Sequence, residues 1–258
     1  MLWGMPTLIE NEGVEECAKL CETLDLDFIE LNMNLLEYQT EKIDVDFFNS
    51  IAKRYNVKYT IHLDENFNAC DFNPYVSKAY LRTLKDTLDI ARLLGASVIN
   101  MHLSRGVYFT MPDKKIYLFE KYSDRYLASV LAFRDFCENE IGKDNIKICI
   151  ENTNGYEDFQ KSAIDIMLES EVFGLTFDIG HNRAIGGRDE EFIAQRSERL
   201  RHFHIHDATL GRDHITLGKG DMDIKRYIKW AENLGASAVI ETKTVRALSA
   251  SCEYIKTL

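Results

Sequence analysis

The feature that most constrains the fold is a regular alternation of short apolar runs and longer amphipathic segments along the chain. The runs are rich in aliphatic and β-branched residues, as buried strands are. Eight of them occur, at residues 2–8, 27–31, 57–62, 97–102, 146–151, 174–178, 201–206 and 237–241. Amphipathic segments, which we expect to be helices, lie between them at residues 14–23, 45–55, 77–94, 158–168 and 221–234. This alternation predicts parallel strands joined by crossover helices, and eight repeats favour a closed (β/α)8 barrel of the TIM type.

The length and the loops of the chain suggest a single α/β domain. The 258 residues are a usual length for one barrel, and no Gly/Ser/Pro-rich linker interrupts them. We therefore expect residues 1–258 to form one domain. A similar junction occurs twice, as LLGASVINMH (93–102) and NLGASAVIET (233–242), and we expect its glycine to end a helix before the next strand.

Charge and hydropathy narrow the possible partners. The formal net charge is −11 and no Lys/Arg cluster stands out, so nucleic acid and anionic membranes are unlikely partners. No apolar run approaches the roughly 18 residues of a membrane span, and the first ten residues lack a signal-peptide pattern. These features favour a cytoplasmic protein with a small-molecule substrate, and a homo-oligomer is compatible with them. None of the six cysteines forms a CxxC pair, so we expect free, buried thiols.

Groups able to carry chemistry gather where the predicted strands end. Barrel enzymes place their catalytic groups just beyond these ends. Every histidine of the chain lies at or near such an end: His62, His102, His181, His202, His204, His206 and His214. Carboxylates end three of the runs, at Glu151, Asp178 and Glu241. Imidazole and carboxylate ligands together predict a site for divalent zinc, manganese, iron or cobalt.

The order of the strands predicts which of these groups would bind the same metal ion. Four of them come from runs five to eight and would converge on one ion: Glu151, Asp178, His204 and Glu241. His62 and His102 would approach from runs three and four as further ligands.

The remaining polar residues at the strand ends leave alternatives open. His181 and His214 would bind metal or hydrogen-bond the substrate. His202 and His206 alternate with His204 along one run, which favours core packing or contacts with the ligands. Glu30 would either contact substrate or orient another polar group.

The longest interval between runs covers residues 103–145 and begins with the polar and aromatic stretch SRGVYFTMPDKKIY. In a barrel this stretch would follow the fourth strand. It is compatible with a lid or substrate wall and equally with an ordinary surface excursion.

Five motifs resemble one superfamily. They are IENTNG (150–155), FDIGHN (177–182), FHIHDA (203–208), HITLGKGDMD (214–223) and VIET (239–242). Together they are similar to the xylose-isomerase-like barrels, which include sugar isomerases and epimerases, dehydratases and the endonuclease IV group (AP endonuclease family 2). The resemblance covers nearly the whole chain and is specific to the superfamily, though not to one reaction.

The epimerase branch implies a single metal held by Glu151, Asp178, His204 and Glu241. Glu151 and Glu241 would then double as catalytic acid and base, and His181 would contact a substrate oxygen.

The endonuclease IV branch implies three zinc ions. His62, His102 and Glu151 resemble the ligands of one zinc, and Glu151 with Asp178, His204 and Glu241 those of a second. His181 and His214 resemble two of the three ligands of the last. Its carboxylate position holds Arg212 here, although Asp213 would substitute by a shift of one residue. The loops after His62 and after the second strand also lack that branch's DNA-binding residues.

Two enzyme functions follow from these features. The first is a divalent-metal-dependent isomerase or epimerase of a small sugar or sugar phosphate, with an enediolate-type intermediate. Candidates for an anionic end of its substrate are Arg105, Arg183, Arg212 and Lys243. The second is an endonuclease IV-like zinc phosphodiesterase. A sugar-binding or regulatory barrel without turnover would require the carboxylates to be idle.

Overall fold

The computed structural model describes residues 1–258 and contains a closed barrel of eight parallel strands. The barrel strands are β1 (Trp3–Pro6), β2 (Phe28–Asn32), β3 (Lys58–His62), β4 (Val98–His102), β7 (Lys147–Glu151), β8 (Phe173–Asp178), β9 (Leu200–Ile205) and β12 (Ser237–Ile240). They pair in sequence order, and β12 closes the barrel against β1. All eight predicted runs therefore form barrel strands, which confirms the predicted TIM barrel.

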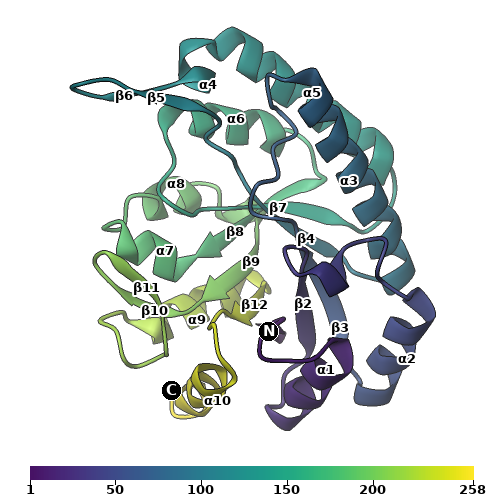
Figure 1. The fold of residues 1–258 in the computed structure, drawn as a ribbon. Coiled ribbons are helices and arrows are strands. Elements are labelled where there is room, and N and C mark those ends of the chain that lie inside the picture. The colour runs from purple at the N-terminus through teal and green to yellow at the C-terminus, as the bar shows by residue number, and fades with distance from the viewer.

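Helices surround the barrel on the outside (Figure 1). They are α1 (Val14–Thr23), α2 (Val45–Tyr55), α3 (Pro74–Leu94), α4 (Leu118–Lys121), α5 (Ser123–Ile141), α6 (Asp158–Leu168), α7 (Ile179–Ala184), α8 (Glu190–Ala194), α9 (Ile224–Leu234) and α10 (Val245–Ile255). Two short 3-10 helices complete the set, η1 (Leu36–Tyr38) and η2 (Ser197–Arg199). The predicted bounds of α1, α2 and α6 are confirmed to the residue.

The capping residues explain where two other helices differ from their predicted starts. Helix α3 begins three residues earlier than predicted, because Asn73 accepts a hydrogen bond from the Tyr75 amide and Pro74 suits the first turn. Helix α9 begins three residues later than predicted, because the Asp223 side chain accepts from the Arg226 amide. At the other ends, Gly95 and Gly235 both adopt the left-handed conformation after α3 and α9. The glycine stops predicted from the repeated junction are confirmed.

Two hairpins extend from the barrel. Strands β5 (Tyr108–Thr110) and β6 (Lys115–Tyr117) form an exposed antiparallel hairpin after β4, which reaches out beyond the ring of helices in Figure 1. Strands β10 (Asp207–Thr209) and β11 (Arg212–Ile215) form a second one after β9. The first occupies the long interval for which a lid, a wall or a surface excursion was expected.

The core lies both inside the barrel and between its strands and the helices. Barrel strands such as β8 are buried along their whole length, as strands enclosed on both sides must be. All six cysteines are buried and none forms a disulfide, as expected. None of the helices combines the length and the apolar character needed to cross a bilayer.

Candidate metal centre

The register of the barrel brings the predicted site residues to one level. His102 of β4 lies opposite Glu151 of β7, and Asp178 of β8 lies opposite His204 of β9. His62 ends β3, and Glu241 directly follows β12. Because neighbouring parallel strands end at the same edge, residues far apart in sequence surround one point at the mouth of the barrel.

Four of these side chains form a compact cluster. The ligand atoms of Glu151, Asp178, His204 and Glu241 all lie within 4.8 Å of one another. Nδ1 of His204 is 3.3 Å from Oε2 of Glu151 and 3.3 Å from Oε2 of Glu241. The side chains of His204 and Asp178 are 0% exposed, and that of Glu151 is 1% exposed. The four groups that the sequence predicted to converge are therefore brought together.

The cluster fits a divalent cation by two structural criteria. Nδ1 of His204 and Oε2 of Glu241 are buried polar atoms without a hydrogen-bond partner, which is uncommon in folded proteins. Nitrogen and oxygen ligands bound to tetrahedral zinc at about 2.0–2.2 Å stand roughly 3.3–3.6 Å apart. The 3.3 Å contacts of His204 match that spacing. A mixed imidazole and carboxylate set also suits manganese, iron or cobalt.

His62 and His102 approach Glu151 from the neighbouring strands. Their Nε2 atoms lie 3.2 and 3.3 Å from Oε2 of Glu151. Nδ1 of His62 is 2.6 Å from the carbonyl oxygen of Leu63, to which it donates, so Nε2 is left to face the carboxylate. The Asn100 amide also donates to Oε2 of Glu151. This second group adjoins the first and shares Glu151 with it.

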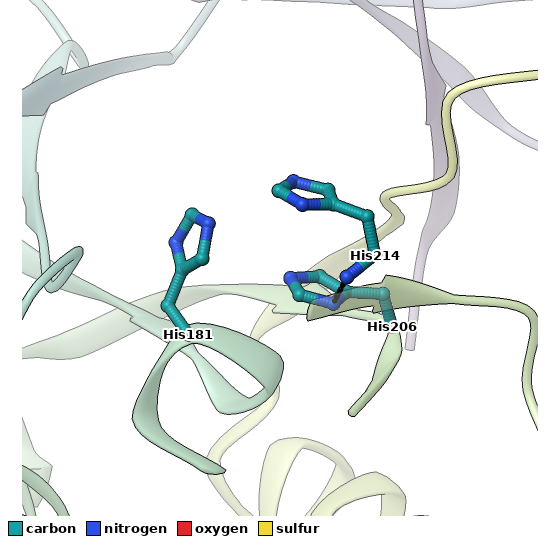
Figure 2. Close-up of side chains that lie close together, drawn as sticks. All are labelled: His181, His206 and His214. Atoms are coloured by element: carbon teal, nitrogen blue, oxygen red, sulfur yellow. Dashed lines mark hydrogen bonds between the residues drawn. The ribbon is translucent and has the colours of Figure 1, made fainter. Parts of the chain in front are cut away.

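A third group contains His181 and His214, which lie close together with His206 in Figure 2. Nδ1 of His181 is 3.2 Å from Oδ2 of Asp178, and Nε2 of His214 is 3.2 Å from Oε1 of Glu241. Asp213 stands between the two histidines, 2.9 Å from Nδ1 of His214 and 3.8 Å from Nε2 of His181. The carboxylate here therefore comes from Asp213.

The structure places Arg212 outside this group. It is exposed on β11 and does not line the cavity above the cluster.

His206 and His202 flank His204 on either side along the chain and contact polar groups around the cluster. His206 is buried, and its Nε2 lies 3.0 Å from Oδ2 of Asp178. Its Nδ1 accepts a hydrogen bond from the His214 amide at 2.8 Å, the contact drawn in Figure 2, and the two rings stack with centroids 4.3 Å apart. Nδ1 of His202 contacts the Ser237 hydroxyl at 2.6 Å. Both side chains therefore contact neighbouring polar groups within the protein.

Glu30 lies beneath the cluster and does not line the cavity. Its carboxylate contacts Thr60, His202 and His204. Glu30 therefore contacts other buried polar groups and not the cavity.

Mutual pairing sets the protonation of the metal-free site. Burial alone would raise the pKa of Glu151, but the charges of His204 and His102 outweigh it and hold that pKa well below the usual range. Burial would lower the pKa of His62, but its hydrogen bond to Glu151 raises it to about 9. Against the same effect of burial, Asp178 and then Glu151 raise the pKa of His181 to about 10. At neutral pH Glu151 is therefore ionised and His62 and His181 are protonated in the metal-free site, and a cation would displace these protons.

A polar cavity of about 570 Å³ lies above the cluster. Fifteen residues line it, and Leu103 is the only hydrophobic one. The interval after β4 contributes Leu103, Ser104 and Arg105 to its wall, whereas the β5–β6 hairpin contributes nothing. Hydrogen-bonding groups on nearly every side suit a ligand rich in hydroxyl groups.

The cations expected to bind an anionic substrate are already engaged with the protein. Nζ of Lys243 lies in the cavity wall, 2.9 Å from Oε1 of Glu241. Arg105 donates to the carbonyl oxygen of Asn154 at 2.7 Å. Arg183 pairs with Asp221 at 2.6 Å and does not line the cavity.

Several polar contacts of the site were not anticipated from the sequence. The Asn152 side chain forms two hydrogen bonds with the backbone of Asp178. Its Oδ1 accepts from the Asp178 N–H and its Nδ2 donates to the Asp178 carbonyl oxygen, both at 2.9 Å. Asn100 precedes His102 by two residues on β4, and this period-two spacing could have predicted its inward position. Asn152 stands within the IENTNG motif, but its contact depends on the neighbouring strand.

The sequence matches the family model described as the xylose isomerase-like TIM barrel over residues 18–258. The chain belongs to this family. Two relatives come from Methanocaldococcus jannaschii, the uncharacterized proteins MJ1188 and MJ1311, each 25% identical to it. The match to MJ1188 covers 75% of this chain and 69% of MJ1188. The match to MJ1311 covers 83% of this chain and 74% of MJ1311.

Solved structures of the same fold superpose over the whole chain. A D-tagatose 3-epimerase-like protein has a TM-score of 0.78 at 21% identity, covering 100% of this chain and 96% of its own. D-allulose 3-epimerase from Methylomonas sp., in complex with D-allulose, has a TM-score of 0.74 at 16% sequence identity, with the same coverage of the two chains. The IOLI protein with a bound zinc atom has a TM-score of 0.75 at 14% sequence identity, and the superposition covers 100% of this chain and 97% of the IOLI chain. At these identities the similarity establishes the fold of this member of the family.

Proposed function

We propose that this protein is a divalent-metal-dependent isomerase or epimerase that acts on a small sugar or sugar phosphate through an enediolate-type intermediate. The observation that carries the proposal is the cluster of Glu151, Asp178, His204 and Glu241 beneath a polar cavity that Glu241 helps to line. The sugar epimerases among the structurally similar proteins support the reaction class.

The same four residues would hold the metal ion, with zinc or manganese as the best candidates. When bound, a divalent cation supplies a Lewis acid that stabilises negative charge on substrate oxygens. The zinc atom bound to the IOLI protein supports a metal in this fold.

Glu151 and Glu241 would act as the general acid and base that transfer protons. Oε2 of each carboxylate lies 3.3 Å from Nδ1 of His204. Glu241 borders the cavity, and Glu151 is buried directly behind His62, His102 and His181, which line it. One carboxylate would remove a proton bound to carbon and the other would return one, as an epimerisation requires. His181 and Lys243 in the cavity wall would hydrogen-bond substrate oxygens.

The proposal is tested by incubating the protein, with manganese or zinc added, with a panel of ketoses, aldoses and their phosphates in D₂O. We expect one class of sugar to isomerise and to take up solvent deuterium at the reacting carbon. If no sugar is converted and none takes up deuterium with either manganese or zinc, the result would count against the proposal. Sugars and their phosphates tested in parallel identify the substrate class.

An endonuclease IV-like phosphodiesterase is the second candidate, and one observation favours it. His62 and His102 adjoin the four-residue cluster at Glu151, and His214 adjoins it at Glu241 together with Asp213 and His181, so that three neighbouring groups of potential ligands are present. Elemental analysis of protein purified without chelator separates the two candidates. About one ion per chain supports the isomerase, whereas two or three tightly held zinc ions with cleavage of abasic-site DNA would support the phosphodiesterase.

A further inference from the structure

Glu30 is a buried carboxylate with no access to the cavity. It belongs to β2, and its side chain is 3% exposed. The Thr60 hydroxyl donates to its Oε2 at 3.1 Å. Nε2 of His202 is 3.3 Å from the same oxygen, and Nε2 of His204 is 2.9 Å from Oε1. No lysine or arginine forms an ion pair with Glu30. The two imidazoles are therefore its only partners that can carry a positive charge.

The two ring nitrogens of His204 face different partners. Nε2 faces Glu30, and Nδ1 faces Glu151 and Glu241 in the proposed metal centre. A metal ion bound at Nδ1 requires a lone pair on that atom, so the remaining ring proton must reside on Nε2. Nε2 of His204 has no hydrogen-bond partner of regular geometry, but it lies 2.9 Å from the Glu30 carboxylate, whose negative charge favours the tautomer that carries the ring proton on Nε2.

We propose that Glu30 is a positioning residue that fixes the ring orientation and the tautomer of His204 for metal binding. The proposal rests on the metal centre of the proposed function, but not on the reaction catalysed there. Carboxylates that hold a metal-binding histidine in this way typically change metal affinity by about 10–100-fold.

The burial of Glu30 supports this assignment. An isolated carboxylate inside a barrel costs free energy, and apolar side chains of similar volume often serve stability equally well in such places. The position of Glu30 is accounted for by its contact with His204, a side chain that itself has no access to solvent.

Zinc affinity tests the proposal in a form that does not depend on turnover. Zinc is removed by a chelator, and binding is then measured by competition with a chromophoric chelator for the wild type, Glu30→Gln and Thr60→Val. Glutamine keeps the shape of Glu30 but offers both an oxygen and an NH₂ group, so it no longer selects one tautomer. We expect its affinity for zinc to fall about 10–100-fold. Thr60→Val alters the same buried layer and leaves the contact with His204 in place, so its affinity should change much less.

Each alternative outcome is informative. Unchanged affinity in Glu30→Gln, or an equal loss in Thr60→Val, would overturn the positioning role. If the wild type binds no zinc, both the metal centre and this inference fail. If the affinity falls as expected and no sugar is converted, the inference stands and only the proposed reaction fails.

A second measurement uses the wild type alone and is independent of how the variants fold. Long-range proton–nitrogen correlations in the zinc-loaded, ¹⁵N-labelled protein report which ring nitrogen of His204 carries hydrogen. We expect the proton on Nε2 and the metal on Nδ1. A proton on Nδ1, or zinc on Nε2, would overturn the proposal.

Discussion

Glu241 and Glu151 are similar in chemistry but differ in their surroundings. Glu241 borders the cavity and contacts His214 and Lys243, whereas Glu151 is covered by imidazoles from three neighbouring elements. For both, the imidazoles overcome the effect of burial and hold the pKa well below its usual range. Both are therefore ionised in the metal-free protein at neutral pH, as metal ligands and general bases need to be.

At the residue scale we predict that Glu151→Gln and Glu241→Gln each reduce turnover by at least about 10²–10⁴-fold, the range for loss of a general acid or base. The amide keeps the size of the side chain but cannot take up a proton at neutral pH. Turnover is measured with the sugar found in the panel, and circular dichroism checks the fold. Glu120→Gln, an exposed residue of α4 away from the cavity, is the matched control. Retained turnover in either cluster variant removes that residue from its acid–base role.

At the scale of elements, Asp207 orders the segment that follows β11. Its carboxylate accepts hydrogen bonds from the amides of Ala208, Gly218 and Gly220, each at 2.9 Å, and of Met222 at 3.3 Å. A Cβ atom on Gly220 would stand only 2.2 Å from Oδ1 of Asp207, so the close approach requires glycine. One buried side chain thus fixes the loop between β11 and α9, next to the hairpin that carries His214.

We predict that Asp207→Asn destabilises the protein by about 1–3 kcal/mol, because the side-chain amide retains one acceptor oxygen and leaves partly buried backbone amides unpaired. Hydrogen exchange should accelerate at residues 216–222, and denaturant unfolding should give the loss of free energy. Asp158→Asn is a suitable control, since the Asp158 side chain is 99% exposed and should change stability by less than about 0.5 kcal/mol. Unaltered exchange in Asp207→Asn would show that the loop is ordered by other contacts.

The sequence predicted the elements well because their signals are local. Apolar runs located all eight barrel strands, and helical periodicity located α1, α2, α3, α6 and α9 but not α5 or α10. Helix starts depended on single side chains, and the starts of α3 and α9 were wrong by three residues each, where Asn73 and Asp223 form the caps.

Contacts between elements were harder to predict, as His214 and Glu30 show. His214 has a left-handed backbone (φ 49°), and the turn at this point brings Asp213 beside His181 while Arg212 stays exposed. Motif spacing alone could not determine that arrangement. Similarly, the position of Glu30 on β2 indicated an inward side chain, but its partner on β9 depends on how the barrel closes.

At the scale of the whole molecule, the proposed metal centre draws on residues from β3 to just beyond β12 and should contribute to the stability of the barrel. Without metal, opposite charges hold the cluster together, and protons on His62 and His181 supply part of the positive charge. Their pKa values of about 9 and 10 lie above the ordinary value of 6.5. Their contribution to the free energy of unfolding is fully present below pH 6.5 and is lost as the pH rises through 9 to 10.

A bound cation takes over the role of these protons, so the effect of metal should depend on pH. We predict that chelation lowers the melting temperature slightly near pH 6 and more at pH 9, because the metal-free protein loses its stabilising imidazolium groups while the loaded protein keeps its cation. Zinc affinity should rise over the same interval, since fewer protons compete for the ligands. The measurement is a set of thermal melts from pH 6 to 9.5, with zinc and with chelator. Parallel falls in the two series would mean that the cluster does not exchange protons for metal, and that the barrel mouth is stabilised by its ion pairs alone.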